Sequence, residues 1–508
     1  MNKRRLIKRS VLALILVTTI DMVVGRSVYH PLVHLYRLTG WGVCQFSLAS
    51  CEYESSQANS GQAAVSSSHH EATKVGIEAL EEGGNAVDAA VAIGYALAVV
   101  HPCCGNLGGG GFMTIQLADG TNKFINFRET APLASTPQMY QDAEGKVISG
   151  LSTQGYLAVG VPGTVAGLEY ARTNYGNADI DRKRLIEPAQ RLAENGFVLS
   201  DADQSLLSNQ RNQFKQEQNV SDIFLNQGKP LNEGDRLTQP DLARTLSLIA
   251  DEGEEAFYQG EIAQKIVAAS QENGGILELE DFSSYRVQES APLTCSYRGF
   301  TVITTPLPGG GPVVCEMLNI VEGYPVGQSE YHSAQHLHWL LSAMLFAYRD
   351  RNLYFGDPNF SDISLDKLLS KEYAESLRTQ TPDNKAVKPE KDLPTTTGGQ
   401  NTTHFSVVDK EGNAVSVTYT INTLFGAGVI ASDTGFFLNN EMDDFTAKVG
   451  SSNSYGLLQG SANQIESGKQ PLSSMAPTIV LDQNQDFYFA TGSPGGSTIP
   501  TTVFQTLV

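Results

Sequence analysis

The chain has 508 residues, of which 41% are hydrophobic and 18% are charged, enough for one large or two ordinary globular domains with a buried core. Its net charge of -20 argues against proteins that bind nucleic acid through clustered Lys and Arg side chains. The 48 glycines and 21 prolines follow no repeat period, which is typical of a sheet-rich enzyme with many tight turns.

The N-terminal segment has the composition of an export signal. Residues 1–9 are basic and are followed by an apolar run over residues 11–20, as in a secretory signal peptide. An uncleaved membrane anchor stays as the alternative, although Asp21 ends the run early for a membrane span. Residues 48–51 (LASC) resemble the acylation signal of bacterial lipoproteins, but they lie far beyond the apolar run. We assign residues 1–63 to a signal or anchor and leader, and expect an exported protein that is periplasmic, extracellular or anchored through this segment.

Six cysteines in an exported chain are candidates for disulfide bonds. Cys44 and Cys51 lie in the leader. The sequence does not determine how the remaining four pair: Cys103, Cys104, Cys295 and Cys315. The two adjacent cysteines lack a CxxC spacing and have only His101 nearby, so a metal site is not favoured. We expect them to pack in the interior.

Residues 71–100 predict two consecutive helices. The first stops at the glycine pair 83–84, and the second opens at Asn85 and is almost wholly apolar, which is typical of a buried helix. Residues 105–117 (GNLGGGGFMTIQL) then lead from glycines into an alternating strand. Neither a dinucleotide fingerprint, which needs strand, glycines and helix in that order, nor a P-loop fits this stretch. We expect a glycine hinge that packs the strand against the buried helix.

The middle of the chain is predicted to be rich in helix. From about residue 180 to 380, helical stretches such as residues 333–352 alternate with turns. Residues 381–401 are polar and contain several prolines and glycines, so we expect an exposed linker there.

The C-terminal part is predicted to be mainly sheet. Two β-branched runs, residues 404–409 and 414–421, flank the turn KEGN. A second pair, residues 478–482 and 487–492, flanks the turn QNQD. Each pair predicts a β-hairpin, and the linker meets the first strand at Thr402.

Thr402 is a candidate nucleophile. A threonine hydroxyl needs a base to remove its proton, and the residue's own α-amine can serve once the preceding peptide bond is cut. The linker would let the new chain end retract while the strand holds Thr402 in place. Two ordinary interpretations stay open, because Asn401-Thr402-Thr403 is also a glycosylation sequon and threonines are common at strand starts.

Several longer motifs resemble one enzyme family. Residues 402–429, followed by FFLNNEMDDF, PLSSMAPTIV and TGSPGGS, resemble the small subunit of the γ-glutamyltranspeptidases, also called glutathione hydrolases. Upstream, the stretches GGNAVDAAVA, HPCCGNLGGGGFM, INFRETAP, GVPGTVAGL and RNLYFGDP resemble the large subunit in the same order. The resemblance covers residues 64–508. It implies an α+β fold, the four-layer αββα sandwich of the N-terminal nucleophile hydrolases.

The resemblance further implies that the chain cuts itself between Asn401 and Thr402, into a large subunit (64–401) and a small subunit (402–508). The freed amine of Thr402 would assist its hydroxyl in attacking the γ-amide of glutathione or a similar γ-glutamyl compound. The resulting γ-glutamyl ester would pass to water or to the amine of an acceptor amino acid or peptide. No metal or organic cofactor is required.

Each chemical feature of a γ-glutamyl group would have a counterpart at a motif position. The resemblance implies a glycine pair for the oxyanion hole, a guanidinium and two serine hydroxyls for the α-carboxylate, and acidic and amide groups for the α-ammonium. These residues are, in that order, Gly495 and Gly496; Arg128, Ser473 and Ser474; and Asn422, Glu441 and Asp444. Thr420 would hydrogen-bond Thr402, and Thr403 would steady the new terminus. Tyr455 would close a lid, residues 446–458, that disfavours long poly-γ-glutamate chains.

Plainer alternatives stay beside these assignments. On sequence alone Arg128 could be a surface residue paired with Glu129, and the serine and glycine pairs are more typical of turns. Two other functions also stay open: an acylase of the same fold, such as those that deacylate cephalosporins, and an uncleaved inactive fragment. Residues 501–508 look like a helix cut short, so we expect an incomplete small subunit with an uncovered sheet edge and apolar face.

Overall fold

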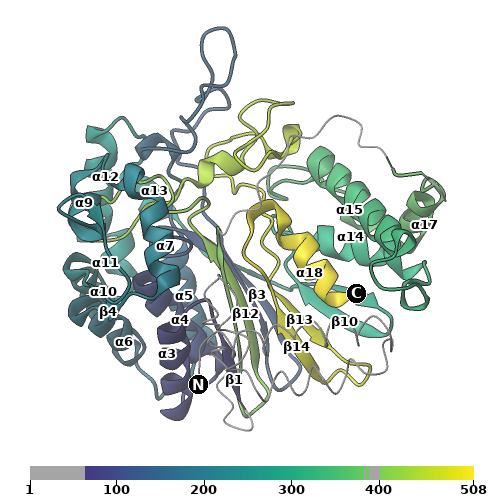
Figure 1. Cartoon of the computed structure of the whole chain (residues 1–508), viewed down its shortest axis with the longest axis horizontal. Coiled ribbons are helices and arrows are strands. Elements are labelled where there is room, and N and C mark those ends of the chain that lie inside the picture. The colour runs from purple at the N-terminus through teal and green to yellow at the C-terminus, as the bar shows by residue number, and fades with distance from the viewer. Residues whose placement is uncertain (1–62, 383–384, 388–400) are drawn as a thin grey trace, which may run out of the picture. The chain divides into compact units, whose positions relative to one another are not determined.

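A computed structural model describes residues 63–382, 385–387 and 401–508 (Figure 1). The predicted signal or anchor, the LASC motif and most of the predicted linker lie outside these residues. No helix of the described chain combines the length and the apolar character needed to cross a membrane.

Two antiparallel sheets form the centre of the described chain. The first has six strands, in the spatial order β1 (Ala64–Ser66), β11 (Thr403–Val408), β12 (Ala414–Thr420), β2 (Gly110–Gln116), β3 (Asn122–Phe127) and β8 (Gln288–Ser290). The second has four, in the order β14 (Phe487–Thr491), β13 (Thr478–Leu481), β10 (Phe300–Thr304) and β9 (Leu293–Tyr297). Both predicted hairpins, β11–β12 and β13–β14, are confirmed.

The predicted large- and small-subunit regions share both sheets. In the first sheet β11 pairs with β1 and β12 pairs with β2, and in the second β13 pairs with β10. A cut before Thr402 would therefore leave the two pieces joined by sheet hydrogen bonds.

Helices cover the outer face of each sheet. On the first sheet pack α3 (His70–Glu81), α4 (Ala86–Val100) and α5 (Thr164–Tyr175), while α6 (Arg182–Asn195) packs on α4 and α10 (Pro240–Glu252) packs on α6. On the second sheet packs α14 (Gly311–Glu322), and on α14 pack α15 (Ala334–Tyr354), α17 (Lys371–Thr379) and α18 (Ile499–Leu507). Figure 1 shows the sheets between these two helix layers. The predicted four-layer αββα sandwich is confirmed.

The remaining helices and short strands of the described chain lie outside the two sheets. Further helices extend the first layer: α7 (Asp201–Asn209), α8 (Arg211–Phe214), α9 (Gln218–Phe224), α11 (Glu254–Tyr258), α12 (Glu261–Glu272) and α13 (Leu279–Ser284). Helix α16 (Leu365–Leu368) precedes α17. Two short ribbons pair β4 (Phe197–Val198) with β7 (Arg236–Leu237) and β5 (Leu225–Asn226) with β6 (Lys229–Pro230). The helix-rich middle region is thus confirmed.

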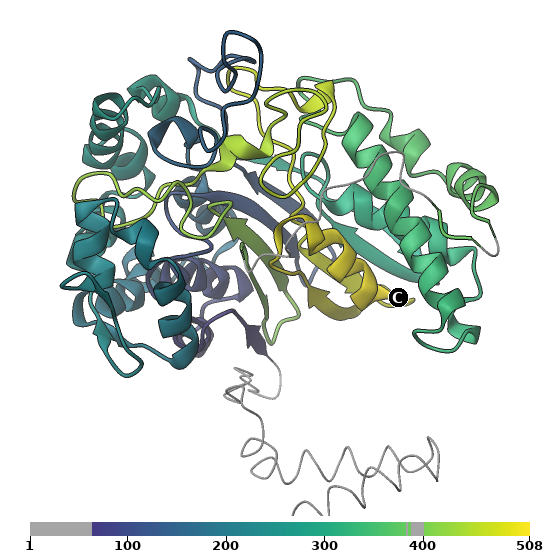
Figure 2. The same cartoon turned by 45° about the horizontal axis from the view of Figure 1, so that its top comes forward.

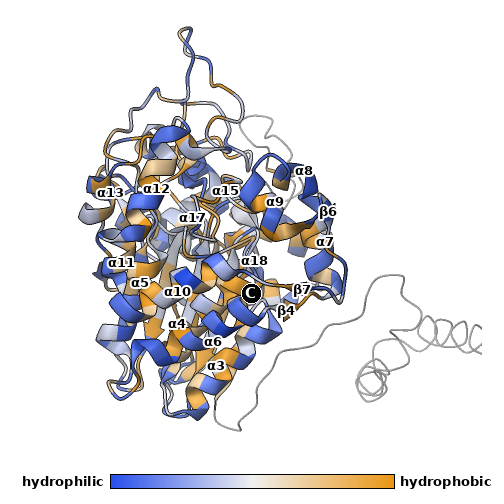
Figure 3. Cartoon of the chain, turned by 90° about the vertical axis from the view of Figure 1, so that its left-hand side faces the viewer, coloured by the Kyte–Doolittle hydropathy of each residue, from blue (hydrophilic) through white to orange (hydrophobic). Residues whose placement is uncertain are grey.

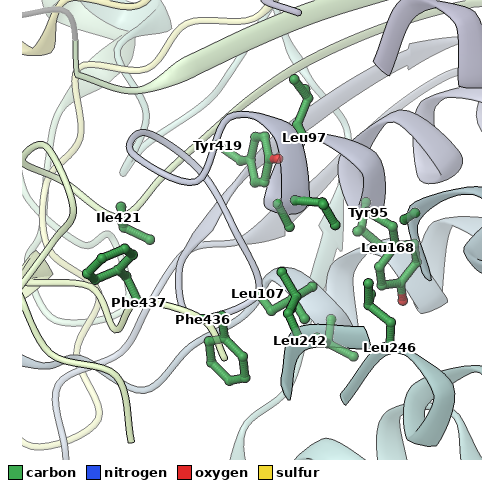
Figure 4. Packing of buried hydrophobic residues seen from close by; sticks show 14 of the residues in the cluster. Tyr95, Leu97, Leu107, Leu168, Leu242, Leu246, Tyr419, Ile421, Phe436 and Phe437 are labelled. Carbon is green, nitrogen blue, oxygen red and sulfur yellow. The ribbon is translucent and has the colours of Figure 1, made fainter. Parts of the chain in front are cut away.

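Helix α4 is the buried helix predicted from the sequence. Asn85 and Asp88 each accept a backbone N–H of the other, which fixes the start of the helix. Every residue of α4 is buried, whereas α6 and α10 present hydrophilic turns to solvent (Figure 3). Tyr419 of β12 lies against α4 (Figure 4), and its hydroxyl donates to the carbonyl oxygen of Gly94 at 3.1 Å. This packing holds the end of β12 against the helix layer.

The described cysteines form two disulfide bonds, Cys103–Cys104 and Cys295–Cys315. The adjacent pair is buried, as expected, but it is also bonded, which the sequence did not reveal. Cys103, Cys104 and His101 are the candidate metal ligands grouped among the described residues. Because a cysteine ligates metal as a thiolate, the bonded pair offers no thiolate ligand.

The helix predicted within residues 501–508 is part of α18. Its Val503 and Phe504 are buried against the second helix layer. β14 forms one edge of the second sheet.

Candidate active site

The strand ends of the first sheet bring three predicted site residues together. Thr402 immediately precedes β11 and Thr420 ends β12, and the antiparallel register places both at one edge. Their hydroxyl oxygens lie 3.0 Å apart. Arg128 follows β3 at the same edge, because β2 is antiparallel to both β12 and β3.

The second sheet contributes its own loops to this edge. Ser473 and Ser474 precede β13, while Gly495 and Gly496 follow β14, and these strands are antiparallel. Figure 2 brings the connecting loops forward, with the yellow-green loops beyond β12 lying beside α18. Residues from four strands and two sheets therefore meet around Thr402.

The glycine run before β2 packs against this edge. A Cβ atom at Gly109 would lie 1.9 Å from the carbonyl oxygen of Thr420, and one at Gly108 would lie 2.2 Å from that of Phe437. No other residue type allows so close an approach. The predicted packing role is thus confirmed, but the glycines approach the end of β12 rather than the buried helix alone.

Thr402 has an unusual backbone conformation. Its φ is +78°, a region in which a β-branched residue is a genuine outlier. The carbonyl oxygen of the preceding residue, Asn401, accepts a 2.9 Å hydrogen bond from the backbone N–H of Gly495. The peptide bond that self-cleavage would cut is therefore both strained on one side and polarised on the other.

The hydroxyl of Thr420 is held in position by a second contact. It accepts a hydrogen bond of 2.9 Å from the backbone N–H of Asn422 while it contacts Thr402. The Thr403 hydroxyl is buried and has no hydrogen-bond partner among the described residues. Among the described residues, no hydrogen bond would have to break before the Thr403 hydroxyl could bind a new chain terminus.

Arg128 lies at the centre of a buried charge cluster. Its side chain is fully buried, and its guanidinium donates to Glu441 and, at 2.6 Å, to Asp444. Glu129 lies 3.5 Å away, and Nε donates to the carbonyl oxygen of Pro471. The alternative of a surface arginine is wrong because Arg128 is buried, although Glu129 does lie within ion-pair distance of it. The sequence did not reveal that the residues expected to bind the α-carboxylate and those expected to bind the α-ammonium would pair with each other.

The cluster shifts the titration of its members. Burial alone would lower the pKa of Arg128, but the carboxylates of Glu441, Glu129 and Asp444 raise it above its ordinary value. Burial raises the pKa of Glu129 to about 7 and that of Glu441 well above its ordinary value, although Arg128 opposes both shifts. The guanidinium thus stays charged, while the carboxyl groups of Glu129 and Glu441 hold a proton more readily than exposed ones would.

Tyr455 lines the same cavity as Thr402. Its hydroxyl donates to the carbonyl oxygen of Asn422 at 2.8 Å and accepts from the side-chain amide of Asn401 at 3.1 Å. A Cβ atom at Gly496 would lie 2.4 Å from its ring. Tyr455 therefore covers Gly496 and contacts the residue on the far side of the predicted cleavage bond.

The serine pair and Asn422 complete the lining. Ser473 Oγ accepts the backbone N–H of Met475 at 3.1 Å, and Ser474 Oγ accepts from Arg351 at 3.3 Å. The side-chain amide of Asn422 donates to the carbonyl oxygen of Asn440 at 2.8 Å, which leaves its side-chain oxygen available to an ammonium group.

One cavity joins almost all predicted site residues. Its lining includes Arg128, Thr402, Thr420, Asn422, Glu441, Asp444, Tyr455, Ser473, Ser474 and Gly496. Gly495 and Asn401 stand just behind it, in contact with each other. The cavity volume is about 20 Å³, room for about one water molecule. A γ-glutamyl group would fit only after Tyr455 or the segment at Asn401 moves.

Sequence reasoning missed two residues of α15 that reach this site. Tyr348 donates from its hydroxyl to the carbonyl oxygen of Ser497, next to the glycine pair, and Arg351 donates to Ser474. Their three-residue spacing puts both on one face of the helix. The sequence of this stretch predicts a helix, and it places Arg351 at the start of the motif RNLYFGDP, but it does not indicate a contact with the site.

A threonine that immediately precedes a central strand of an αββα sandwich, and that follows a polarised peptide bond, defines an N-terminal nucleophile hydrolase. The fold also resembles solved structures of this kind. The match to a cephalosporin acylase from Bacillus halodurans covers 88% of this chain and 80% of that protein, with 27% identity and a TM-score of 0.76. The match to the γ-glutamyltranspeptidase of Helicobacter pylori covers 64% of this chain and 93% of that protein, with 41% identity and a TM-score of 0.62.

Sequence comparison identifies the family. The family model for γ-glutamyltranspeptidase matches residues 72–508. A glutathione hydrolase proenzyme of a Pseudomonas species (strain A14) is 52% identical over 87% of this chain and 77% of its own length. One from Escherichia coli K12 is 44% identical over 88% and 77%. The chain belongs to the γ-glutamyltranspeptidase family.

Proposed function

We propose that the chain is a proenzyme that cuts its own Asn401–Thr402 bond and then transfers γ-glutamyl groups through Thr402. The observation that carries this proposal is the single cavity shared by the Thr402 hydroxyl and the Arg128 charge cluster. Family membership supports the reaction, and the site geometry supports the assignment of residues.

In the first step, Thr402 Oγ1 attacks the carbonyl carbon of Asn401. The Gly495 N–H already bonded to that carbonyl oxygen would stabilise the oxyanion. The C–N bond then breaks, the nitrogen takes up a proton, and an ester links Asn401 to the threonine oxygen. Water hydrolyses the ester, which leaves a carboxylate on Asn401 and a free amine on Thr402. The backbone strain at Thr402, whose φ is +78°, would be relieved when the bond breaks, and this would favour the cut.

In the second step, the new α-amine accepts the proton of the Thr402 hydroxyl as the oxygen attacks a γ-amide carbonyl. For glutathione, the amine of the remaining dipeptide leaves with a proton, and a γ-glutamyl ester stays on Thr402. Water then yields glutamate, whereas an amino acid or peptide amine yields a transpeptidation product. The Thr420 hydroxyl, 3.0 Å from that of Thr402, would hold the nucleophile in line.

The charge cluster suits the amino acid head of the donor. A γ-glutamyl group presents an α-carboxylate and an α-ammonium side by side. The α-carboxylate would replace Asp444 and Glu441 at the Arg128 guanidinium, and the two acids would turn to the α-ammonium. Since Arg128 already pairs with these acids, the substrate would exchange one set of ion pairs for another.

Maturation would also open the cavity. The Asn401 side chain contacts the Tyr455 hydroxyl, so its departure after the cut removes one contact that closes the site. Tyr455 and the loop of residues 446–458 would then act as a lid over small γ-glutamyl donors. We expect long poly-γ-glutamate chains to be disfavoured.

Export of the chain is part of the same proposal. Two disulfide bonds in the described chain support an oxidising compartment, in line with the signal-like N-terminus. Glutathione and other γ-glutamyl compounds, together with acceptor amino acids or peptides, would be its small-molecule partners.

An acylase acting on cephalosporin-type amides is the second candidate, because the sandwich also resembles a cephalosporin acylase. An acyl side chain without an amino acid head would leave the Arg128 cluster without a function. Release of nitroaniline from γ-glutamyl-p-nitroanilide tests the choice. Competition by glutathione but not by a glutaryl amide, which lacks the α-ammonium, supports the proposal, and the reverse preference contradicts it.

A further inference from the structure

A second arginine lies behind the cavity without an anionic partner. Arg351, in the last turn of α15, has 1% of its surface exposed. No carboxylate among the described residues lies within ion-pair distance of it. Its guanidinium donates only to neutral oxygens, those of Ser474, Gln459 and Asn352, at 3.3–3.4 Å. Its Nε has no hydrogen-bond partner in the described chain.

An uncompensated buried cation is unfavourable, and an arginine cannot escape the penalty by losing its proton at ordinary pH. Burial and the nearby Arg128 lower the pKa of Arg351, whereas Tyr348 and Asp444 raise it. The opposing effects of Arg128 and Asp444 mean that Arg351 lies within electrostatic range of the site where a donor head would bind. A bound anion would supply the charge that the protein itself does not.

Arg351 contacts a residue expected at the α-carboxylate of the donor, and it is linked through Gln459 to a residue expected at its α-ammonium. Arg351 Nη2 donates to Ser474 Oγ, so the hydroxyl hydrogen of Ser474 is free to point into the cavity that Ser474 lines. Arg351 Nη1 also donates to Gln459 Oε1, and the Gln459 amide donates to the backbone carbonyl of Asp444 at 2.8 Å. One guanidinium thus positions a hydrogen-bond donor for a carboxylate and the loop that carries an acid for the ammonium.

We propose that Arg351 is a positioning residue that acts through Ser474 to strengthen binding of the donor's α-carboxylate. The inference rests on the proposed function, because it takes the cavity to be the γ-glutamyl site. A hydrogen bond donated by a cation makes the Ser474 hydroxyl a stronger donor in turn. The positive charge behind it also lowers the electrostatic potential energy of a carboxylate in the cavity.

The test compares two donors, γ-glutamyl-p-nitroanilide and the same compound with its α-carboxylate converted to a neutral carboxamide. The ratio of their kcat/KM values is measured for the wild type, R351M and R351K. We expect R351M to lower this ratio roughly tenfold or more, mainly through the KM of the carboxylate donor. R351K, which keeps the charge, should lower it less. R349M is the matched control, since Arg349 pairs with Asp350 instead, and should keep the wild-type ratio.

The ratio stays unchanged in R351M if both donors lose the same factor in kcat/KM, or if neither loses any. The first result would show a merely structural role, and either result would overturn the inference. Should R351M fail to mature, R351K is compared in the presence and absence of S474A. The inference requires R351K to lower the ratio beside Ser474 and to have no further effect in S474A, and equal effects in both backgrounds would overturn it. If the wild type itself uses both donors equally or neither, the proposed function fails instead.

Discussion

The backbone N–H of Gly495 lies 2.9 Å from the carbonyl oxygen of Asn401, to which it donates a hydrogen bond. The donor expected to stabilise the oxyanion during turnover thus already contacts the bond that must break first. The same glycine would serve both reactions, because each develops negative charge on a carbonyl oxygen next to Thr402.

The contact between Thr402 and Thr420 predicts a specific loss of rate. We expect T420V to slow nitroaniline release by roughly 10²-fold in kcat with little change in KM, since it removes a hydroxyl that positions the nucleophile. T420S should retain most of the rate. T418V is a matched control on the same strand, because the Thr418 hydroxyl contacts His404 and not the nucleophile. Wild-type kcat in T420V would contradict the role.

Because Tyr455 lies so close to Gly496, we expect the effects of substitutions at these two positions on kcat/KM to depend on each other. A methyl group at Gly496, whose φ is +55°, would lie 2.4 Å from the tyrosine ring. We expect G496A to lower kcat/KM by at least about tenfold by forcing the lid or the glycine loop to move. Adding Y455A should restore part of the loss, because it removes the clash. Simple additivity of the two effects in a double-mutant cycle would exclude this coupling.

The buried carboxyl of Glu129 predicts that stability falls as pH rises. Its pKa is raised from 4.5 to about 7 by burial, so between these values the folded protein holds a proton that the unfolded chain has lost. The free energy of unfolding then decreases with rising pH, by ~3 kcal/mol at most across this window.

We therefore expect the unfolding midpoint of E129Q to depend less on pH between 5 and 7 than that of the wild type. Both are measured in a T402A background, so that the chain stays in one piece. E233Q, at an exposed position, is the control and should keep the wild-type slope. An identical slope in E129Q would mean that Glu129 does not titrate in this range.

Much of the architecture could be predicted because local patterns determine it. The β-branched runs around KEGN and QNQD predicted both hairpins, and the antiparallel register then forces Thr402 and Thr420 to one edge. The apolar run after Asn85 predicted a buried helix because a helix with no polar face has no place at a surface. These features depend on residues close together in the chain.

The charges of the site could not be predicted in the same way. The pairing of Arg128 with Glu441 and Asp444 joins residues more than 300 positions apart. Sequence gives no measure of the burial that raises the pKa of Glu129. Arg351 could not be predicted for the same reason, since only the packing of α15 against α14 and residues 461–463 brings it behind Ser474. The motif resemblance supplied candidate residues, but their contacts follow from tertiary structure.

The most direct test of the central claim is the intact mass of the purified chain after incubation, together with the N-terminal sequence of each product. The account predicts that the wild type separates into two polypeptides under denaturing conditions, the smaller beginning at Thr402. T402A should remain a single chain, and T121A, at an exposed turn, should be cut like the wild type. A wild-type chain that stays whole, or whose smaller product begins at another residue, would contradict the account.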